Sequence, residues 1–301
     1  MLSIAALYLS VYLQFPDRGP APKLAVNPFA ESGTYRKGQE VGWTVTPGFE
    51  FDSKVSYTYE VKLDNNVLVS SGTLDLSGGT ASIKHKAEKP GMVFMRISPS
   101  IGRFTTFGAA IEPENLKPVV PKPKDFDDFW KRKISQLRAI PEKLVVTQGT
   151  ASNERLDDST FQMDHVNGTK VYGQMAKLRH GGKFPAIVIF QWASPPYPLH
   201  PSWVTGLAEQ GWLAVNVQPH DALPREPQSY YDKLPNALKN YTSIGMESRE
   251  TSYFVEMYLR GVRAIDMVRK MPEWDGKTLV VMGTSMGGQQ AIVAAGLNPS
   301  V

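Results

Sequence analysis

The chain has 301 residues, more than one ordinary hydrophobic core usually holds, so its length predicts two domains. Its composition, 42% hydrophobic and 21% charged with a net charge of only +4, is typical of globular proteins and gives no reason to expect a nucleic-acid partner. The absence of cysteine excludes disulfides, thiolate zinc sites and a cysteine nucleophile, and the five histidines lack metal-ligand spacing, so we expect no metal and no other cofactor.

Residues 1–24 are predicted to be a leader. Residues 2–13 form an apolar run that is too short to span a bilayer but has the length of the central region of a signal peptide. We therefore expect a secreted or periplasmic protein with no stable membrane insertion. No Lys or Arg precedes the run, which a start codon assigned too late would explain. An N-terminal strand or a disordered tail is the alternative.

Residues 25–112 are predicted to form a small all-β domain, a sandwich of immunoglobulin type. Apolar and polar residues alternate with period two, as at Val41, Trp43 and Val45, and turn residues such as those at 64–66 separate about seven short runs. No group of catalytic residue types occurs here, so packing or contact with carbohydrate is the expected role. Trp43 is expected in the core rather than as a sugar platform.

Residues 113–124 are predicted to be a linker, because four of the twelve are proline. Asp125 is expected to cap the helix that follows, which Pro141 ends. The apolar face of this helix is expected to consist of Phe126, Phe129, Trp130, Ile134 and Leu137.

Residues 125–301 are predicted to form an α/β domain. Apolar runs at 185–190, 213–217 and 278–282 are typical of buried strands, and helical patterns cover 203–210 and 252–271. On the second helix, Glu256 is expected to pair with Arg260 and Asp266 with Lys270. Buried strands alternating with helices predict a doubly wound, mostly parallel sheet whose ligands bind beyond the carboxyl ends of its strands.

The strongest functional pattern is Gly283-x-Ser285-x-Gly287, which follows the last apolar strand and precedes an alanine-rich helical segment. A nucleophile elbow needs this arrangement, because its turn is so tight that side chains on the flanking residues would collide. The free N–H groups at the start of the new helix suit a reaction that builds negative charge on oxygen. A chance match in a glycine-rich turn is the alternative.

Two further segments resemble the acetyl xylan esterase and cephalosporin C deacetylase family of α/β-hydrolases. Residues 123–130 contain Asp-Phe-Asp-Asp-Phe-Trp, which is similar to the family's Asp-Phe-x-x-Phe-Trp signature in its first helix. Residues 245–266 are similar to the family's aromatic-rich helix before the nucleophile strand. The resemblance extends from about residue 122 to the end of the sequence given.

The resemblance implies a serine carboxylesterase that deacetylates acetylated xylan, acetylated sugars or small esters, and a possible homo-oligomer. Ser285 would be the nucleophile, and the backbone N–H groups of Met286 and Ala193 would hold the oxyanion. Two positions depart from the family pattern. Gln-Trp-Ala at 191–193 replaces a small His-Gly or similar pair, and Ser-Arg at 248–249 replaces Asp-Pro. These departures suggest a distant branch with another ester preference.

The acid and base of a catalytic triad are the missing parts of this prediction. In α/β-hydrolases both follow the serine, but residues 286–301 contain no Asp, Glu or His. His220-Asp221 is a poor substitute, because adjacent side chains point apart and the chain order is wrong. We therefore expect a sheet incomplete at its C-terminal end, an acid and a base beyond residue 301, and a 301-residue chain that alone is inactive and poorly soluble.

Two alternatives remain open from the sequence. One is another α/β-hydrolase, such as a peptidase or a dienelactone-hydrolase-like enzyme. The other is a non-catalytic carbohydrate-binding protein in which the β-sandwich holds the function.

Overall fold

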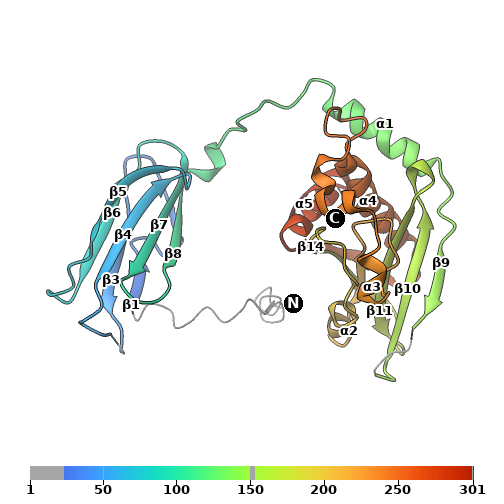
Figure 1. The fold of residues 1–301 in the computed structure, drawn as a ribbon, viewed down its shortest axis with the longest axis horizontal. Coiled ribbons are helices and arrows are strands. Elements are labelled where there is room, and N and C mark those ends of the chain that lie inside the picture. Colours follow the sequence, from blue (N-terminus) through green and yellow to red (C-terminus); the bar gives the residue numbers. More distant parts are fainter. Residues whose placement is uncertain (1–23, 50, 150–152, 300) are drawn as a thin grey trace. The chain divides into compact units, whose positions relative to one another are not determined.

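The computed structural model describes residues 24–49, 51–149, 153–299 and 301, so the predicted leader lies outside the described residues except for Leu24. The described chain divides into two compact units, and the division falls after Pro121. In Figure 1 the first unit consists of strands followed by one short helical turn, and the second combines strands with longer helices.

The described residues of the first unit form two sheets that share one hydrophobic core. The smaller sheet has the order β1 (Leu24–Pro28), β3 (Glu40–Pro47), β6 (Ala81–Lys86). The larger has the order β2 (Thr34–Tyr35), β8 (Thr105–Ile111), β7 (Gly91–Pro99), β4 (Tyr57–Leu63), β5 (Val67–Thr73). Trp43 is only 2% exposed and lies in the core, as predicted. The unit is therefore all-β, and its immunoglobulin type stays a prediction.

The predicted linker contains a short 3-10 helix, η2 (Pro113–Asn115), and α1 (Phe126–Arg138) follows it. Asp125 is the N-cap residue of α1, as predicted, but its side chain does not cap the helix. Its carboxylate makes no capping hydrogen bond and instead accepts two from the guanidinium of Arg249, one of them over 2.9 Å. A bidentate bond to a charged group is stronger than one to a backbone amide, so a distant residue outcompetes the local one. Phe129 and Leu137 of the predicted apolar face are buried.

The second unit is built on a six-stranded sheet within the described residues, with β14 and β12 at one side. The order is β14 (Trp274–Gly283), β12 (Phe184–Phe190), β13 (Leu213–Val217), β11 (Lys170–Leu178), β10 (Leu156–Asp164), β9 (Val145–Gln148). β12 pairs in parallel with both β13 and β14, whereas the other three pairings are antiparallel. The prediction of a mostly parallel sheet is therefore wrong, and the sheet is mixed.

The physical reason lies in residues 145–178, which the sequence reading left unassigned. They form β9, β10 and β11, and β10 joins β11 through a connection that holds only the short 3-10 helix η3 (Val166–Gly168). A connection of this length can return the chain only antiparallel, whereas parallel neighbours need a long crossover.

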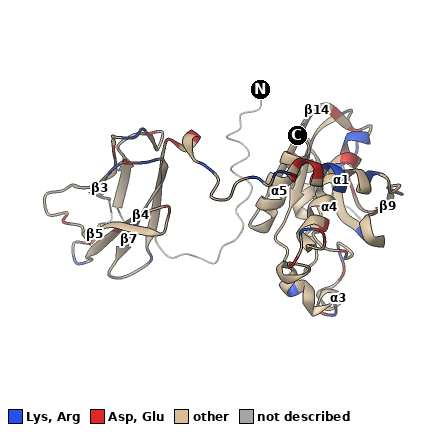
Figure 2. Ribbon diagram, turned by 90° about the horizontal axis from the view of Figure 1, so that it is seen from above, with Lys and Arg blue, Asp and Glu red and all other residues tan. Residues whose placement is uncertain are grey.

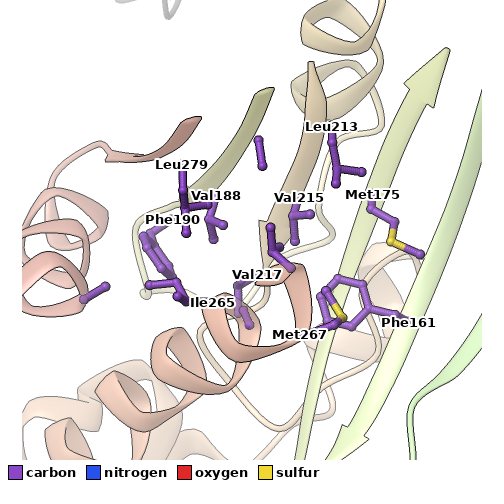
Figure 3. Packing of buried hydrophobic residues seen from close by; sticks show 14 of the residues in the cluster. Phe161, Met175, Val188, Phe190, Leu213, Val215, Val217, Ile265, Met267 and Leu279 are labelled. Atoms are coloured by element: carbon purple, nitrogen blue, oxygen red, sulfur yellow. The ribbon is translucent and has the colours of Figure 1, made fainter. Parts of the chain in front are cut away.

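Helices cover both faces of this sheet, as a doubly wound fold requires. Alternate residues of β12 serve opposite faces, because successive side chains of a strand point to opposite sides. Ile187 and Ile189 pack with α2 (Ser202–Ala208), whereas Val188 and Phe190 pack with α4 (Tyr253–Lys270) and α5 (Met286–Leu297). Figure 3 shows the second face, with side chains from β12 and β13 directed toward α4. The remaining described helices are α3 (Gln228–Tyr231) and the 3-10 helix η4 (Asn236–Ser243).

The charges on α4 follow the prediction only in part. Glu256 pairs with Arg260 over 2.7 Å, as expected from their spacing. Asp266 does not pair with Lys270, because it binds Arg138 of α1 over 2.8 Å. α1 packs against α4 and brings this arginine within reach of the carboxylate. Figure 2 shows basic and acidic residues together on α1, as expected of a solvated helix face.

The described residues contain neither a membrane-spanning helix nor a cluster of metal-binding side chains. None of their helices combines the length and apolar character that crossing a membrane demands. No group of three or more His, Asp or Glu side chains among them is arranged to hold a metal ion.

Candidate active site

Ser285 lies at the turn between β14 and α5. β14 ends at Gly283 and α5 begins at Met286, so the serine occupies the position before the helix. Its backbone has φ 56° and ψ −124°, a region that non-glycine residues rarely adopt. Such strain persists only where the surrounding structure imposes it, and it is concentrated at functional sites. The serine is exposed at the end of the strand. This is the strand-turn-helix geometry of a nucleophile elbow.

The glycines on either side of Ser285 are there because no larger residue fits. A Cβ atom on Gly283 would lie 2.0 Å from the carbonyl oxygen of Gly287. One on Gly287 would lie 2.2 Å from the carbonyl oxygen of Phe190, at the end of β12. Both obstacles are backbone atoms, which cannot rotate away. The elbow is therefore pressed directly against the loop that follows β12.

That loop is held at every carbonyl group from residue 190 to residue 193. The four donors, in that order, are the backbone N–H of Thr284 (3.4 Å), Nε2 of Gln290 (3.1 Å), the hydroxyl of Tyr197 (2.6 Å) and Nε2 of His220. The first two belong to the elbow and to α5, so the loop is tied to the element that carries the serine.

The backbone N–H groups of Ala193 and Met286 remain free. Neither donates a hydrogen bond to another of the described residues. Ala193 is 1% exposed, and Met286 packs against the same small apolar cluster, which includes Tyr241 and Met257. The Met286 N–H also lies at the N-terminus of α5, where the helix dipole favours negative charge. Two unpaired donors of this kind can stabilise a developing oxyanion.

His220 is fully buried, and both of its ring nitrogens are engaged. The carbonyl of Ala193 can only accept, so Nε2 carries the proton, and Nδ1 then accepts from the hydroxyl of Tyr253 over 2.7 Å. Burial lowers the pKa of His220 to about 4, so the ring is neutral at ordinary pH. Asp221 does not bind His220; its carboxylate accepts a hydrogen bond from the backbone N–H of Lys170 over 3.1 Å. This pair is therefore not an acid and base for Ser285.

The tyrosine hydroxyls around the loop keep their protons. Burial raises the pKa of Tyr197 and also that of Tyr253, the latter to about 12. The ring of Tyr197 stacks on that of Trp192, with centroids 4.6 Å apart, and Trp203 contacts both rings edge-on. Both hydroxyls can therefore act as donors within a well-packed aromatic surrounding.

Tyr197 and Gln290 were not among the predicted site residues, and His220 was considered only as a base for Ser285 and rejected. One signal was available for His220, which comes soon after the strand at 213–217. Because parallel neighbours end at the same edge of a sheet, the segments after β12 and β13 meet there. No local pattern marks Tyr197 or Gln290, because their partners are set by how the loop folds back.

The chain is similar in sequence to known acetyl esterases. A family model described as acetyl xylan esterase (AXE1) matches residues 112–301. The acetyl esterase Axe7A of Xylanibacter ruminicola is 29% identical over 252 residues, which are 82% of this chain and 57% of that protein. The chain thus spans little more than half the length of this curated relative.

Two solved structures share the fold. Acetyl xylan esterase 1 from a Thermoanaerobacterium species has a TM-score of 0.51 at 22% identity, covering 60% of this chain and 57% of that one. An acetyl xylan esterase from a Paenibacillus species has a TM-score of 0.53 at 22% identity, covering 61% and 59%. The predicted α/β-hydrolase fold is confirmed by these likenesses.

Proposed function

Because the chain belongs to the acetyl xylan esterase family, we propose that it is a serine carboxylesterase that removes acetyl groups from xylan or from other acetylated sugars. The observation that carries the proposal is the strained backbone of Ser285, held between two glycines that tolerate no side chain. Backbone strain of this kind lowers stability and is concentrated at functional sites, which supports a catalytic role for the exposed serine.

The reaction would proceed by acyl transfer in two steps. The Oγ atom of Ser285 attacks the ester carbonyl, its proton passes to a base, and the sugar hydroxyl leaves with a proton. Water then attacks the acetyl-serine and releases acetate, which regenerates the hydroxyl. The N–H groups of Met286 and Ala193 would hold the oxygen that becomes negative in each step. Losing one such donor typically costs about 10² to 10³ in rate.

The base is not His220, because its Nε2 proton is committed to the Ala193 carbonyl and its Nδ1 to Tyr253. This histidine instead holds the loop after β12 through the Ala193 carbonyl. From the apolar run at 2–13 we further propose that the enzyme acts outside the cytoplasm, where polysaccharide is found.

The test is hydrolysis of p-nitrophenyl acetate and of acetylated xylose by the protein expressed from its complete gene. Ser285→Ala should lower kcat by at least about 10⁴, as loss of a nucleophile does. Ser202→Ala removes an exposed hydroxyl at the start of α2 and should leave kcat unchanged. Turnover that survives Ser285→Ala would rule the proposal out. A preference for peptides or lactones over acetylated sugars would keep the nucleophile but overturn the substrate.

A further inference from the structure

We infer that Tyr197 and His220 are positioning residues that together fix the direction of the Ala193 N–H. The inference rests on the proposed role of Ala193 as an oxyanion-hole donor. Each side chain binds one of the two peptide groups that flank the Ala193 Cα atom, and the proposal assigns neither a contact with the ester.

The first peptide group joins Trp192 to Ala193. It is trans and planar, so the Ala193 N–H points opposite to the Trp192 carbonyl. The Tyr197 hydroxyl donates to that carbonyl over 2.6 Å, which fixes the plane and therefore the N–H. Tyr197 is itself held, because its ring stacks on Trp192 and its own carbonyl accepts from Nε2 of Gln218 over 3.2 Å.

The second peptide group carries the Ala193 carbonyl, which accepts from Nε2 of His220. The ring of His220 is fully buried and cannot swing, because the Tyr253 hydroxyl on α4 binds its other nitrogen over 2.7 Å. With both flanking planes held, neither backbone dihedral of Ala193 is free. The two restraints come from different parts of the fold: Tyr197 lies in the loop after β12 itself, and His220 follows β13.

Such restraint matters because residues 191–193 belong to no helix or strand. An oxyanion donor is effective only if it already points at the developing charge, since reorientation during the reaction would consume the stabilisation it provides. The carbonyl groups of residues 190–193 all accept hydrogen bonds from the protein, whereas the Ala193 N–H donates none to the described residues and is left for the substrate. The side chains of Tyr197 and His220 thus restrain the backbone at Ala193, as the hydrogen bonds of a helix or strand would do elsewhere.

Three variants test the inference in the protein expressed from its complete gene. Tyr197→Phe removes only the hydroxyl and keeps the stacked ring. His220→Leu removes the donor to Ala193, whereas His220→Gln keeps an N–H donor at about the same reach. A matched control is Tyr231→Phe, because this tyrosine is 2% exposed and donates to the carbonyl of Leu223 over 2.5 Å outside the site.

Tyr197→Phe should lower kcat by at least about 10-fold while KM changes by less than about twofold, because the lost interaction acts in the transition state. His220→Leu should do the same, and His220→Gln should recover part of the loss. Tyr197→Phe combined with His220→Leu should not exceed about 10³-fold, the usual limit for one oxyanion donor. Tyr231→Phe should lower the melting temperature and leave kcat of the folded enzyme unchanged.

The inference is overturned if Tyr197→Phe keeps the wild-type kcat, or if its loss matches that of Tyr231→Phe once the folded fraction is counted. In that event an inactive Ser285→Ala variant would leave the proposed function standing. Turnover that survives Ser285→Ala would overturn the proposed function and this inference together.

Discussion

Gly287 is a position at which a single added methyl group should disrupt the elbow. In Gly287→Ala the new Cβ would lie 2.2 Å from the carbonyl oxygen of Phe190, 2.6 Å from its carbonyl carbon and 2.9 Å from the nitrogen of Gln191. All three are backbone atoms, so no change of rotamer relieves the contact. Overpacking usually costs about 1 to 3 kcal/mol, and three rigid contacts place this substitution at the upper end, about 3 kcal/mol.

The assay is thermal unfolding followed by circular dichroism or calorimetry. For a unit of this size each kcal/mol shifts Tm by about 2 to 4 °C, so Gly287→Ala should lower it by about 6 to 12 °C. Gly288→Ala is the matched control, because its Cβ would meet nothing nearer than 3.4 Å. Alanine also suits a helix better than glycine by about 0.5 to 1 kcal/mol. Equal melting temperatures for the two variants would refute the reasoning.

Three further predictions concern the charged groups. Arg225→Leu should lower the free energy of unfolding by about 3 kcal/mol in chemical denaturation, because it leaves the buried Asp158 carboxylate, 2% exposed, without its ion-pair partner 2.5 Å away; an unchanged transition would contradict this. Arg249→Leu should leave the denaturant midpoint nearly unchanged, because the ion pair between Arg249 and Asp125 is solvent-exposed. A large shift of the midpoint would contradict this prediction. The free energy of unfolding should also fall on acidification, because burial lowers the pKa of His220 to about 4. The unfolded chain binds the proton first, so the stability that the neutral His220 contributes is complete above pH 6.5 and is lost as the pH falls toward 4, by at most about 1.4 kcal/mol per pH unit. In His220→Gln, the plot of unfolding free energy against pH should be flatter by that amount.

The elements with strong periodicity could be predicted from the sequence, whereas the antiparallel half of the sheet could not. The strand at 213–217 coincides with β13, and the helix expected at 252–271 is α4, shorter by one residue at each end. β10 escaped notice because Asp158 and Ser159 are buried within it. A carboxylate in this stretch argues locally against a buried strand. Its burial is possible because Arg225 pairs with Asp158, and this partner lies 67 residues away in the sequence.

The same distinction applies to the candidate site. Ser285 and its glycines could be predicted, because the constraint that selects them is contained in five consecutive residues. The position of Asp125 before the first helix could be predicted, but its side-chain partner could not, because Arg249 lies far away in the sequence. The hydrogen bond from His220 to Ala193 could not be predicted, because two parallel strands bring their following segments together without specifying which side chains meet.

The central claim is that Ser285 is the nucleophile, and covalent trapping tests it most directly. The protein expressed from its complete gene is treated with a fluorophosphonate, digested and analysed by mass spectrometry. A single phosphonyl adduct on the peptide that contains Ser285, lost in Ser285→Ala together with acetate release, is the predicted result. An adduct on another residue, or acetate release that continues with Ser285 modified, would contradict the account.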